Sequence, residues 1–213
     1  MIYVYISLLL IASYLLGSIQ SGLIIGKVFR HIDIREHGSK NTGSTNAIRV
    51  LGFKYGIWSF IFDVLKGGFL IFLLKILNAT ELYMYNDSLN FISIYGLVAV
   101  FGHAFSIFND FKGGKAVATS LGVILAIEPL IAVVILVVFF IVFLITRYVS
   151  LGSTFAALAA LISIIVRVFI PLNNYNLQSK IFELFIFLVL TSLIFIKHKT
   201  NYQRLKTGTE NKM

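Results

Sequence analysis

The sequence predicts an all-α fold, a polytopic transmembrane helical bundle of about seven helices with its N-terminus outside and its C-terminus cytoplasmic. Composition is the first reason: hydrophobic residues make up 58% of the chain and charged residues only 13%, with a mean hydropathy of +0.92. Average soluble domains carry roughly 25% charged residues. The second reason is that apolar runs of membrane-spanning length recur along the chain, and the third is that basic residues gather in alternate connections.

The length and charge of the chain bound its architecture. A length of 213 residues predicts a single integral membrane domain over residues 1–213, and it is too short to bury this much apolar surface in a soluble core. The absence of cysteine excludes disulfides and thiolate chemistry. A net charge of +9 would suggest nucleic acid in a soluble protein. Here the basic residues lie between apolar runs, which favours membrane orientation and anionic ligands, with no nucleic-acid partner.

The apolar runs define the expected helices. Five runs are clear candidates, namely Ile2–Gly26, Tyr55–Leu77, Phe91–Phe108, Leu151–Ile170 and Ile181–Ile196. The first lacks a basic start and a cleavage site, so we expect it to be retained and not removed as a signal peptide. A longer run holds Glu128-Pro129 near its middle, and because proline disfavours helix continuation we split it into Ala116–Ile127 and Leu130–Ile145. The first of these pieces is about 18 Å long as a helix, which is short for a full span.

Charge supports seven helices and orients them. The connection over residues 27–54 is strongly basic, whereas residues 78–90 carry Glu81 and Asp87 and no Lys or Arg. With seven helices, every basic connection and the basic tail fall on the cytoplasmic side, as the positive-inside rule expects. This predicts a multi-pass membrane protein whose basic segments face the cytoplasm. Arg167 and Lys180 fit less well, and both could snorkel to the interface.

Two segments on that side combine cations with glycine, hydroxyl and amide residues. In residues 31–49 the polar positions include Ser39, Asn41, Gly43, Thr45 and Arg49. Turn-forming N–H groups make concave anion sites and Arg offers a planar fork for phosphate, although an ordinary solvated loop has a similar composition. In residues 102–120, Lys112-Gly-Gly-Lys115 opens a short helix, where an anion is stabilised. Interfacial lysines that mark a helix end are an equal alternative.

Two further segments carry weaker signals. Residues 147–154 include Ser150 and Ser153 at a helix boundary, where helix capping by Ser150 is the simpler interpretation. In residues 198–210, His198, Asn201 and Arg204 are three apart, so a helix would align them along one face. Attraction of this basic segment to anionic lipid is the alternative.

Ionisable residues also lie within the apolar runs. Asp63 and Lys66 are three apart in the second run, and we interpret them as a pair with a structural role near the site. His103 is either a hydrogen-bonded structural residue or a base. The sequence has no HExxH or GxSxG motif and no Cys/His cluster, so no metal and no cofactor is expected. The pattern favours phosphate binding at the interface over metal hydrolysis or covalent catalysis.

These segments together resemble one family. HGSKNTGSTNAIRVLG, GHAFSIFNDFKGGKAVATSLG, RYVSLGS and IKHKTNYQRLKTGTE are similar to the motifs of the bacterial acyl-phosphate-dependent glycerol-3-phosphate acyltransferases, as are GSIQSGLIIGK and DVLKGG. The resemblance runs from about Gly17 to Glu210 in the family's order. Gln20 stands where the family usually has Pro, Ser44 where Ala is common and Ala116 where Gly is common. None of these departures falls on a polar position assigned to chemistry.

The resemblance implies a function and a set of site residues. A fatty acyl group would move from acyl phosphate to the sn-1 hydroxyl of glycerol 3-phosphate, giving lysophosphatidic acid and phosphate at the start of phospholipid synthesis. Glycerol 3-phosphate would be held by Ser39, Arg49, Lys112 or Lys115, His198 and Asn201. Acyl phosphate would be surrounded by Asn41, Gly43, Thr45, Ser150 and Ser153. A soluble acyltransferase that produces the acyl phosphate is a candidate partner, beside the lipid bilayer. The resemblance also implies a place in the bacterial plasma (inner) membrane, with the active site facing the cytoplasm.

Two questions stay open at the level of sequence. The hydroxyl proton could pass to a phosphate of the substrate, or His103 or His198 could act as the general base. A transporter for an organic phosphate would also need cations near membrane helices. Transporters place such sites near the midplane, often in repeated halves, whereas here the polar residues lie at one face and no repeat is visible.

Overall fold

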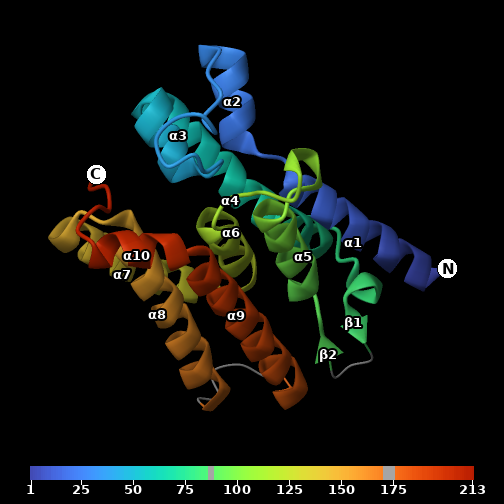
Figure 1. The fold of residues 1–213 in the computed structure, drawn as a ribbon. Helices are drawn as coiled ribbons and strands as arrows, with labels where there is room; N and C mark the ends of the chain where they lie inside the picture. The colour runs from blue at the N-terminus through green and yellow to red at the C-terminus, as the bar shows by residue number, and fades with distance from the viewer. Residues whose placement is uncertain (86–88, 170–175) are drawn as a thin grey trace. The chain divides into compact units, whose positions relative to one another are not determined.

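The structure, a computed structural model, describes residues 1–85, 89–169 and 176–213, and within these ranges it contains ten α-helices (Figure 1). The chain divides into two compact units, one formed by Met1–Leu82 and Ile92–Ala126 and the other by Tyr83–Phe91 and Ile127–Met213. The all-α prediction is therefore confirmed, with one small addition: β1 (Met84–Tyr85) and β2 (Leu89–Asn90) pair antiparallel. The single domain over residues 1–213 stays a prediction.

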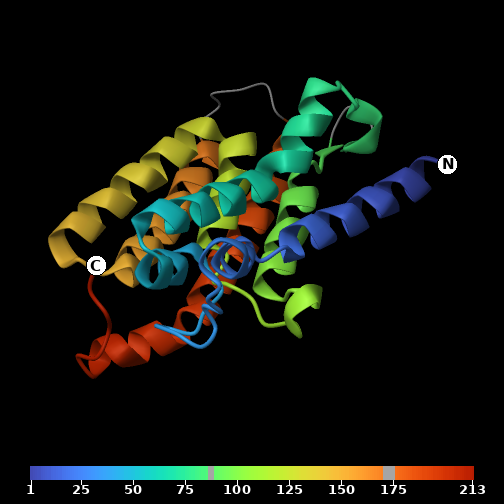
Figure 2. The same cartoon turned by 90° about the horizontal axis from the view of Figure 1, so that it is seen from above.

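The first unit contains six helices and two 3₁₀ turns along its described residues. In chain order they are α1 (Ile2–Ser18), α2 (Ser21–Arg30), α3 (Ser44–Leu51), α4 (Phe53–Ile76), η1 (Thr80–Leu82), α5 (Ser93–Ala104), η2 (Ile107–Asn109) and α6 (Val117–Ile127), whose last residue belongs to the second unit. Helix α1 packs on α5, and α4 packs on α2, α3 and α5 (Figure 2). Helix α4 therefore contacts helices that precede it in the chain and one that follows it.

Glycines allow the helices of the first unit to approach closely. A Cβ built at Gly67 in α4 would overlap the carbonyl of Thr119 in α6, and one at Gly122 would overlap the carbonyl of Val64. Small residues at such crossings let helix backbones touch, which is the usual way in which membrane helices pack. The DVLKGG segment is thus a packing motif of this unit as well as a point of family resemblance.

The first apolar run is a broken helix. We expected one helix over Ile2–Gly26, but α1 ends at Ser18 and α2 starts at Ser21, with a 46° bend between them. The break frees backbone carbonyls that a continuous helix would use, and side chains satisfy them: Oγ of Ser106 donates to the carbonyl of Ser18 at 2.6 Å, and Nζ of Lys66 donates to the carbonyl of Ile19 at 2.5 Å. These partners come from distant segments, so local sequence did not reveal the break.

The second unit contains four helices along its described residues. They are α7 (Pro129–Thr146), α8 (Val149–Phe169), α9 (Leu177–Lys197) and α10 (Lys199–Lys206). Helix α7 packs on α8, α8 packs on α9, and the hairpin β1–β2 reaches α9, where the N–H of Asn90 donates to Oγ of Ser179 at 2.9 Å. The predicted division at proline is confirmed, because Glu128 has φ −137° and ψ 73° between α6 and α7.

Arg167 is part of an ion-pair cluster. It pairs with Glu128 through Nη1, and the same nitrogen lies 3.7 Å from Oε2 of Glu183. The side chain is only 11% exposed. One cation therefore compensates two carboxylates inside the second unit. Whether Arg167 also reaches an interface stays a prediction. A buried ion cluster of this kind requires all its members, because a lone charge in an apolar environment is costly.

Length and composition identify the candidate membrane spans. Among the described residues, four helices are long and apolar enough to cross a membrane, namely α4, α7, α8 and α9, and α1 with α2 makes a fifth if it is counted as one broken span. Helices α5 and α6 are apolar but shorter. The count of seven crossings and their orientation stay predictions. Asp87, used above as a sign of an outer connection, lies outside the described residues.

Candidate functional site

The loop before α3 is built around one buried amide. Nδ2 of Asn46, in the first turns of α3, donates to the carbonyls of Ile34, His37 and Asn41 at 2.9, 3.2 and 2.9 Å, and its Oδ1 accepts the N–H of Ser39 at 2.8 Å. The side chain is 2% exposed. Since these bonds satisfy otherwise unpaired backbone groups, Asn46 fixes the path of residues 34–41 and with it the direction in which Ser39 and Asn41 point.

Backbone geometry explains the glycine of this loop. Gly38 has φ +60°, and a Cβ at that position would overlap Oδ1 of Asn46. Further along, Oδ1 of Asn41 accepts the N–H of Gly43 at 2.9 Å, an Asx turn that leads into the first turn of α3. Thr45 and Arg49 then lie one turn apart on α3. The half-buried loop therefore presents hydroxyl, amide and guanidinium donors near a helix N-terminus, where an anion is favoured.

A second chain of contacts ties this loop to the segment after α5. Nη1 of Arg35 donates to Oδ1 of Asn109 at 2.7 Å, and Nδ2 of Asn109 donates to the carbonyl of Lys112 at 2.5 Å. Arg35 also forms an ion pair with Asp33 at 2.6 Å. The hydrogen bond from Arg35 holds the pKa of the Asp33 carboxyl well below its usual range. Asp33 thus stays ionised, which keeps Arg35 in place to position Lys112.

The glycines of Lys112-Gly-Gly-Lys115 are required by His103. A Cβ at Gly113 would overlap the carbonyl of His103, and one at Gly114 would overlap Nε2 of its ring. The N–H of Gly114 donates to that carbonyl at 3.2 Å. The segment is a loop without regular secondary structure, and α6 begins only at Val117. The expectation that the lysines open the helix is therefore corrected: both lysines precede it. His103 is 3% exposed, and its ring and carbonyl pack against the two glycines of this loop.

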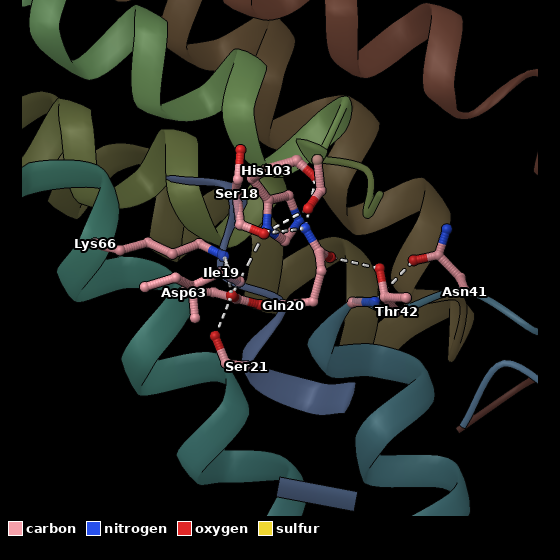
Figure 3. Close-up of polar contacts among 11 residues, drawn as sticks. Ser18, Ile19, Gln20, Ser21, Asn41, Thr42, Asp63, Lys66 and His103 are labelled. Atoms are coloured by element: carbon pink, nitrogen blue, oxygen red, sulfur yellow. Dashed lines mark hydrogen bonds and ion pairs between the residues drawn. The ribbon is translucent and has the colours of Figure 1, made fainter. Parts of the chain in front are cut away.

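Gln20 joins the two loops (Figure 3). Its Oε1 accepts the hydroxyl of Thr42 at 2.6 Å, and its Nε2 donates to the carbonyl of His103 at 3.2 Å. Both Gln20 and Thr42 are 4% exposed. On the far side of this contact, a Cβ built at Gly43 would lie 3.9 Å from Cα of Gly114, so the two loops approach each other directly.

An ionic cluster lies beneath the helix break. Oδ1 of Asp63 accepts the hydroxyl of Ser21 at 2.6 Å and lies 2.8 Å from Nζ of Lys66 and 3.6 Å from Nδ1 of His103 (Figure 3). Asp63 is 1% exposed. The predicted Asp63–Lys66 pair is therefore confirmed. Because Lys66 also holds the carbonyl of Ile19, the pair connects the broken helix to α4 and supports His103 at the same time.

The second unit has its own polar cluster, centred on a carboxylate from the tail. Glu210 accepts hydrogen bonds from the hydroxyl of Ser150 at 3.0 Å, from Nδ2 of Asn201 at 2.6 Å and from Nε of Arg204 at 2.6 Å. Burial raises the pKa of the Glu210 carboxyl, but these hydrogen bonds outweigh it, so the net pKa is lowered. Helix capping by Ser150 was the wrong interpretation, because its hydroxyl bonds to Glu210 inside α8.

The alignment of His198 with Asn201 is confirmed. His198 is the residue just before α10 and Asn201 lies within it, and both are buried, at 2% and 4% exposed respectively. Nδ1 of His198 lies 2.8 Å from the carbonyl of Ile194, which makes Nδ1 the protonated nitrogen of the neutral ring and leaves Nε2 as an acceptor. The hydroxyl of Ser153 donates to the carbonyl of Val149 at 2.9 Å within α8.

The predicted site residues thus fall into two groups. The first unit holds Ser39, Asn41, Gly43, Thr45, Arg49, His103, Lys112 and Lys115, and the second holds Ser150, Ser153, His198 and Asn201. Sequence reasoning missed the residues that support these groups: Asn46, Gln20 and Glu210. Asn46 and Glu210 lay within the recognised motifs but had no assigned role. Along the described residues, no group of three or more His, Asp or Glu side chains is placed to hold a metal ion.

Comparisons with known proteins agree on one family. A family model described as glycerol-3-phosphate acyltransferase matches residues 7–208. Proteins named glycerol-3-phosphate acyltransferase from Acholeplasma laidlawii and Lactococcus lactis subsp. lactis are 42% and 45% identical, covering 98% and 97% of this chain and 93% and 92% of their own lengths. A crystal structure of PlsY, an integral membrane glycerol 3-phosphate acyltransferase, in its glycerol 3-phosphate form has a TM-score of 0.83 at 37% identity, covering 98% of this chain and 96% of that one. Its lysophosphatidic acid form has a TM-score of 0.81.

Proposed function

The chain belongs to the glycerol-3-phosphate acyltransferase family of multi-pass integral membrane proteins, and we propose that its acyl donor is a fatty acyl phosphate. The acyl group is transferred to the sn-1 hydroxyl of glycerol 3-phosphate, giving lysophosphatidic acid and inorganic phosphate as the first step of phospholipid synthesis. The observation that carries the proposal is that two donor-rich loops approach each other at Gly43 and Gly114. The first loop leads into the helix that carries Arg49, and the second contains Lys112 and Lys115. Such loops suit two phosphate groups.

Each substrate has its proposed contacts. Ser39, Arg49, Lys112, Lys115, His198 and Asn201 bind glycerol 3-phosphate, and Asn41, Gly43, Thr45, Ser150 and Ser153 surround the acyl phosphate. For the first unit, the support is that Asn46 and Gln20 hold these donors in a half-buried loop. For the second unit, the support is that Ser150 and Asn201 already bind an anionic group, the carboxylate of Glu210.

The reaction depends more on the positioning of the two substrates than on a strong base. Acyl phosphate is a mixed anhydride, so its carbonyl carbon is activated and phosphate is a good leaving group. The sn-1 hydroxyl oxygen forms the new ester bond, the bond from the acyl carbon to the phosphate oxygen breaks, and the hydroxyl proton passes to a phosphate oxygen. Cations and backbone N–H groups offset the repulsion between the two phosphates, and their fixed geometry turns an encounter of two anions into an oriented attack.

Two histidines compete with this substrate-assisted proton transfer. Nε2 of His198 is an acceptor when the ring is neutral, whereas His103 lies between Asp63 and the glycine loop. His198→Gln and His103→Gln separate the possibilities through the pH dependence of kcat/KM. Loss of the fall in rate at low pH, with near-normal substrate binding, would establish a histidine base, and retention of that acidic limb in both variants supports proton transfer to substrate.

The proposal includes an orientation. Seven crossings with the N-terminus outside place the basic connections and both motif-bearing loops at the cytoplasmic face of a bacterial plasma membrane, where glycerol 3-phosphate is available. A soluble acyltransferase that makes acyl phosphate is the proposed source of the donor. Acyl phosphate carries one long apolar chain and one charged head, so it suits a site at the membrane interface.

The test is an assay of purified protein in detergent. Acyl phosphate and labelled glycerol 3-phosphate should give labelled lysophosphatidic acid, and a fatty acyl thioester in place of acyl phosphate should give none. Product from the thioester alone would refute the proposed donor. The transporter alternative predicts no acylated product and accumulation of labelled glycerol 3-phosphate in sealed vesicles.

A further inference from the structure

We propose that Gln20 is a positioning residue for the transferase, holding the loop of residues 38–46 and the loop of residues 112–115 in register through its side-chain amide. This rests on the proposed function for the roles of the two loops, but it concerns a residue to which neither the family resemblance nor the sequence pattern gives any role. Gln20 lies at the break between α1 and α2 and is not itself proposed to touch substrate.

The geometry of the bridge uses both ends of the amide. Oε1 of Gln20 accepts the hydroxyl of Thr42 at 2.6 Å, and Thr42 stands between Asn41 and Gly43 in the first loop. Nε2 donates to the carbonyl of His103 at 3.2 Å and to the carbonyl of Ser18 at 3.3 Å. An amide is the side chain that can accept from a hydroxyl and donate to two carbonyls at once.

The carbonyl of His103 carries the contact onward to the second loop. It accepts the N–H of Gly114 at 3.2 Å as well as Nε2 of Gln20. One side chain therefore connects the hydroxyl of Thr42 in the first loop, through the carbonyl of His103, to the backbone N–H of Gly114 in the second. Figure 3 shows the part of this path that runs from Thr42 through Gln20 to His103. Because the path is buried, with Gln20 and Thr42 each 4% exposed, water cannot replace a lost bond easily.

The broken helix gives this bridge its anchor. The carbonyl of Ser18 is also held by Ser106, and the carbonyl of the next residue, Ile19, by Lys66. Gln20 therefore projects from a backbone that is fixed at the two residues before it, and it transmits that position to the loops. A change at Gln20 should shift the relative position of the two proposed phosphate sites without removing any group that binds phosphate.

The experiment compares kinetic constants of purified variants. Gln20→Met keeps the length of the side chain but removes every hydrogen bond, and Thr42→Val removes only the bond to Oε1 of Gln20. Thr42→Val should raise the KM for glycerol 3-phosphate or for the acyl donor about three- to tenfold, the effect expected of one buried hydrogen bond, and Gln20→Met, which loses all three bonds, should raise it at least as much. Thr42→Ser retains the hydroxyl and should restore the constants of the original protein. In the double variant, KM should be no higher than in Gln20→Met alone, because both changes break the same path.

A matched control separates positioning from general stability. Ser13→Ala removes a buried hydrogen bond of 2.6 Å from α1 to the carbonyl of Tyr95 in α5, outside the proposed site. It should lower the unfolding temperature without changing either KM. The proposal is overturned if folded Gln20→Met and Thr42→Val keep both KM values within about twofold, if their effects multiply, or if Ser13→Ala raises KM equally. Should the original protein use another acyl donor, the proposed donor fails, and the same comparison is made with that donor.

Discussion

Asn46 accepts the backbone N–H of Ser39 on its side-chain oxygen at 2.8 Å, so a residue of α3 determines the position of one that precedes the helix by five positions. The other end of the same amide holds three carbonyls of the loop. Ser39 is the first residue proposed to contact glycerol 3-phosphate. Its position therefore depends on a buried amide that itself is not proposed to touch substrate.

Replacing Asn46 tests this dependence. Asn46→Leu has a similar volume but leaves the buried carbonyl of Ile34, two partly buried carbonyls and one N–H without their partner, at a cost of about 1–3 kcal/mol for each group that is buried. We expect the free energy of unfolding in detergent to fall by at least about 2 kcal/mol and the KM for glycerol 3-phosphate to rise. Asn211→Leu makes the same chemical change at an exposed tail residue and should leave both quantities unchanged. A normal KM for glycerol 3-phosphate in folded Asn46→Leu would show that this loop is not part of the binding site.

The carboxylate of Glu210 should stabilise the second unit. Glu210→Gln removes the charge that accepts from Asn201 and Arg204, and charged hydrogen bonds contribute about 1.5–3 kcal/mol each when buried. A lower unfolding temperature is expected, together with reduced kcat/KM, because the neutral amide keeps one oxygen for Ser150 and Asn201 but places an NH₂ group against Nε of Arg204. Glu81→Gln, at an exposed carboxylate of η1, is the control and should match the original protein in both measurements.

The same carboxylate predicts a pH dependence. The pKa of Glu210 is lowered in the folded protein, so its contribution to stability is fully present above the ordinary glutamate pKa of about 4.3 and is lost as pH falls through the lower folded value. Unfolding temperatures measured from pH 7 downward should therefore converge for the original protein and Glu210→Gln at acidic pH. A difference that persists unchanged below that range would show that charge is not the cause.

The ion cluster of α7, α8 and α9 predicts a large effect from one substitution. Arg167→Met leaves Glu128 and Glu183 without their shared cation, and breaking a buried pair costs about 3–5 kcal/mol. Adding Glu128→Gln to this variant should recover part of the lost stability, because one uncompensated charge is removed. Lys180→Met serves as the control for removing a cation near the same end of α9 and is expected to have little effect. Equal unfolding temperatures for both single variants would contradict the cluster.

The proposed seven crossings can be tested directly because the chain has no cysteine. Single-cysteine variants Leu130→Cys, beside the turn between α6 and α7, and Arg147→Cys, at the end of α7, are both at exposed positions. An impermeant thiol reagent should label Leu130→Cys from outside intact cells and Arg147→Cys only after the cells are opened. Labelling of both positions from the same side would show that α7 does not cross the membrane, and it would contradict the proposal of seven crossings.

Much of the helical architecture could be predicted from sequence because it depends on local signals. Apolar length located α4, α7, α8 and α9, and the fixed φ of Pro129 located the end of α6. The break after Ser18 could not be predicted in the same way. It is stabilised by Lys66 and Ser106, which are distant in sequence, and neither contact leaves a pattern around the break itself.

The same distinction between local signals and distant contacts applies to the candidate site. Residue types pointed to Ser39, Arg49 and the two lysines, because phosphate needs donors and cations. Residue types could not show which polar side chains support the loops instead of facing a ligand. Gln20 was treated as a departure from the family that falls on no position assigned to chemistry, yet it makes three buried hydrogen bonds. The two glycines between Lys112 and Lys115, which were read as part of an anion site, are required by the ring and carbonyl of His103. Those assignments depend on contacts across the fold.

The most direct test of the proposed reaction follows one oxygen atom. Glycerol 3-phosphate labelled with ¹⁸O in the sn-1 hydroxyl is mixed with unlabelled acyl phosphate and the purified protein, and both products are analysed by mass spectrometry. Attack of the hydroxyl on the acyl carbon predicts lysophosphatidic acid that retains the label in its ester oxygen, with unlabelled inorganic phosphate released in equal amount. Release of phosphate without labelled lysophosphatidic acid, or no turnover of acyl phosphate by folded protein, would contradict the account.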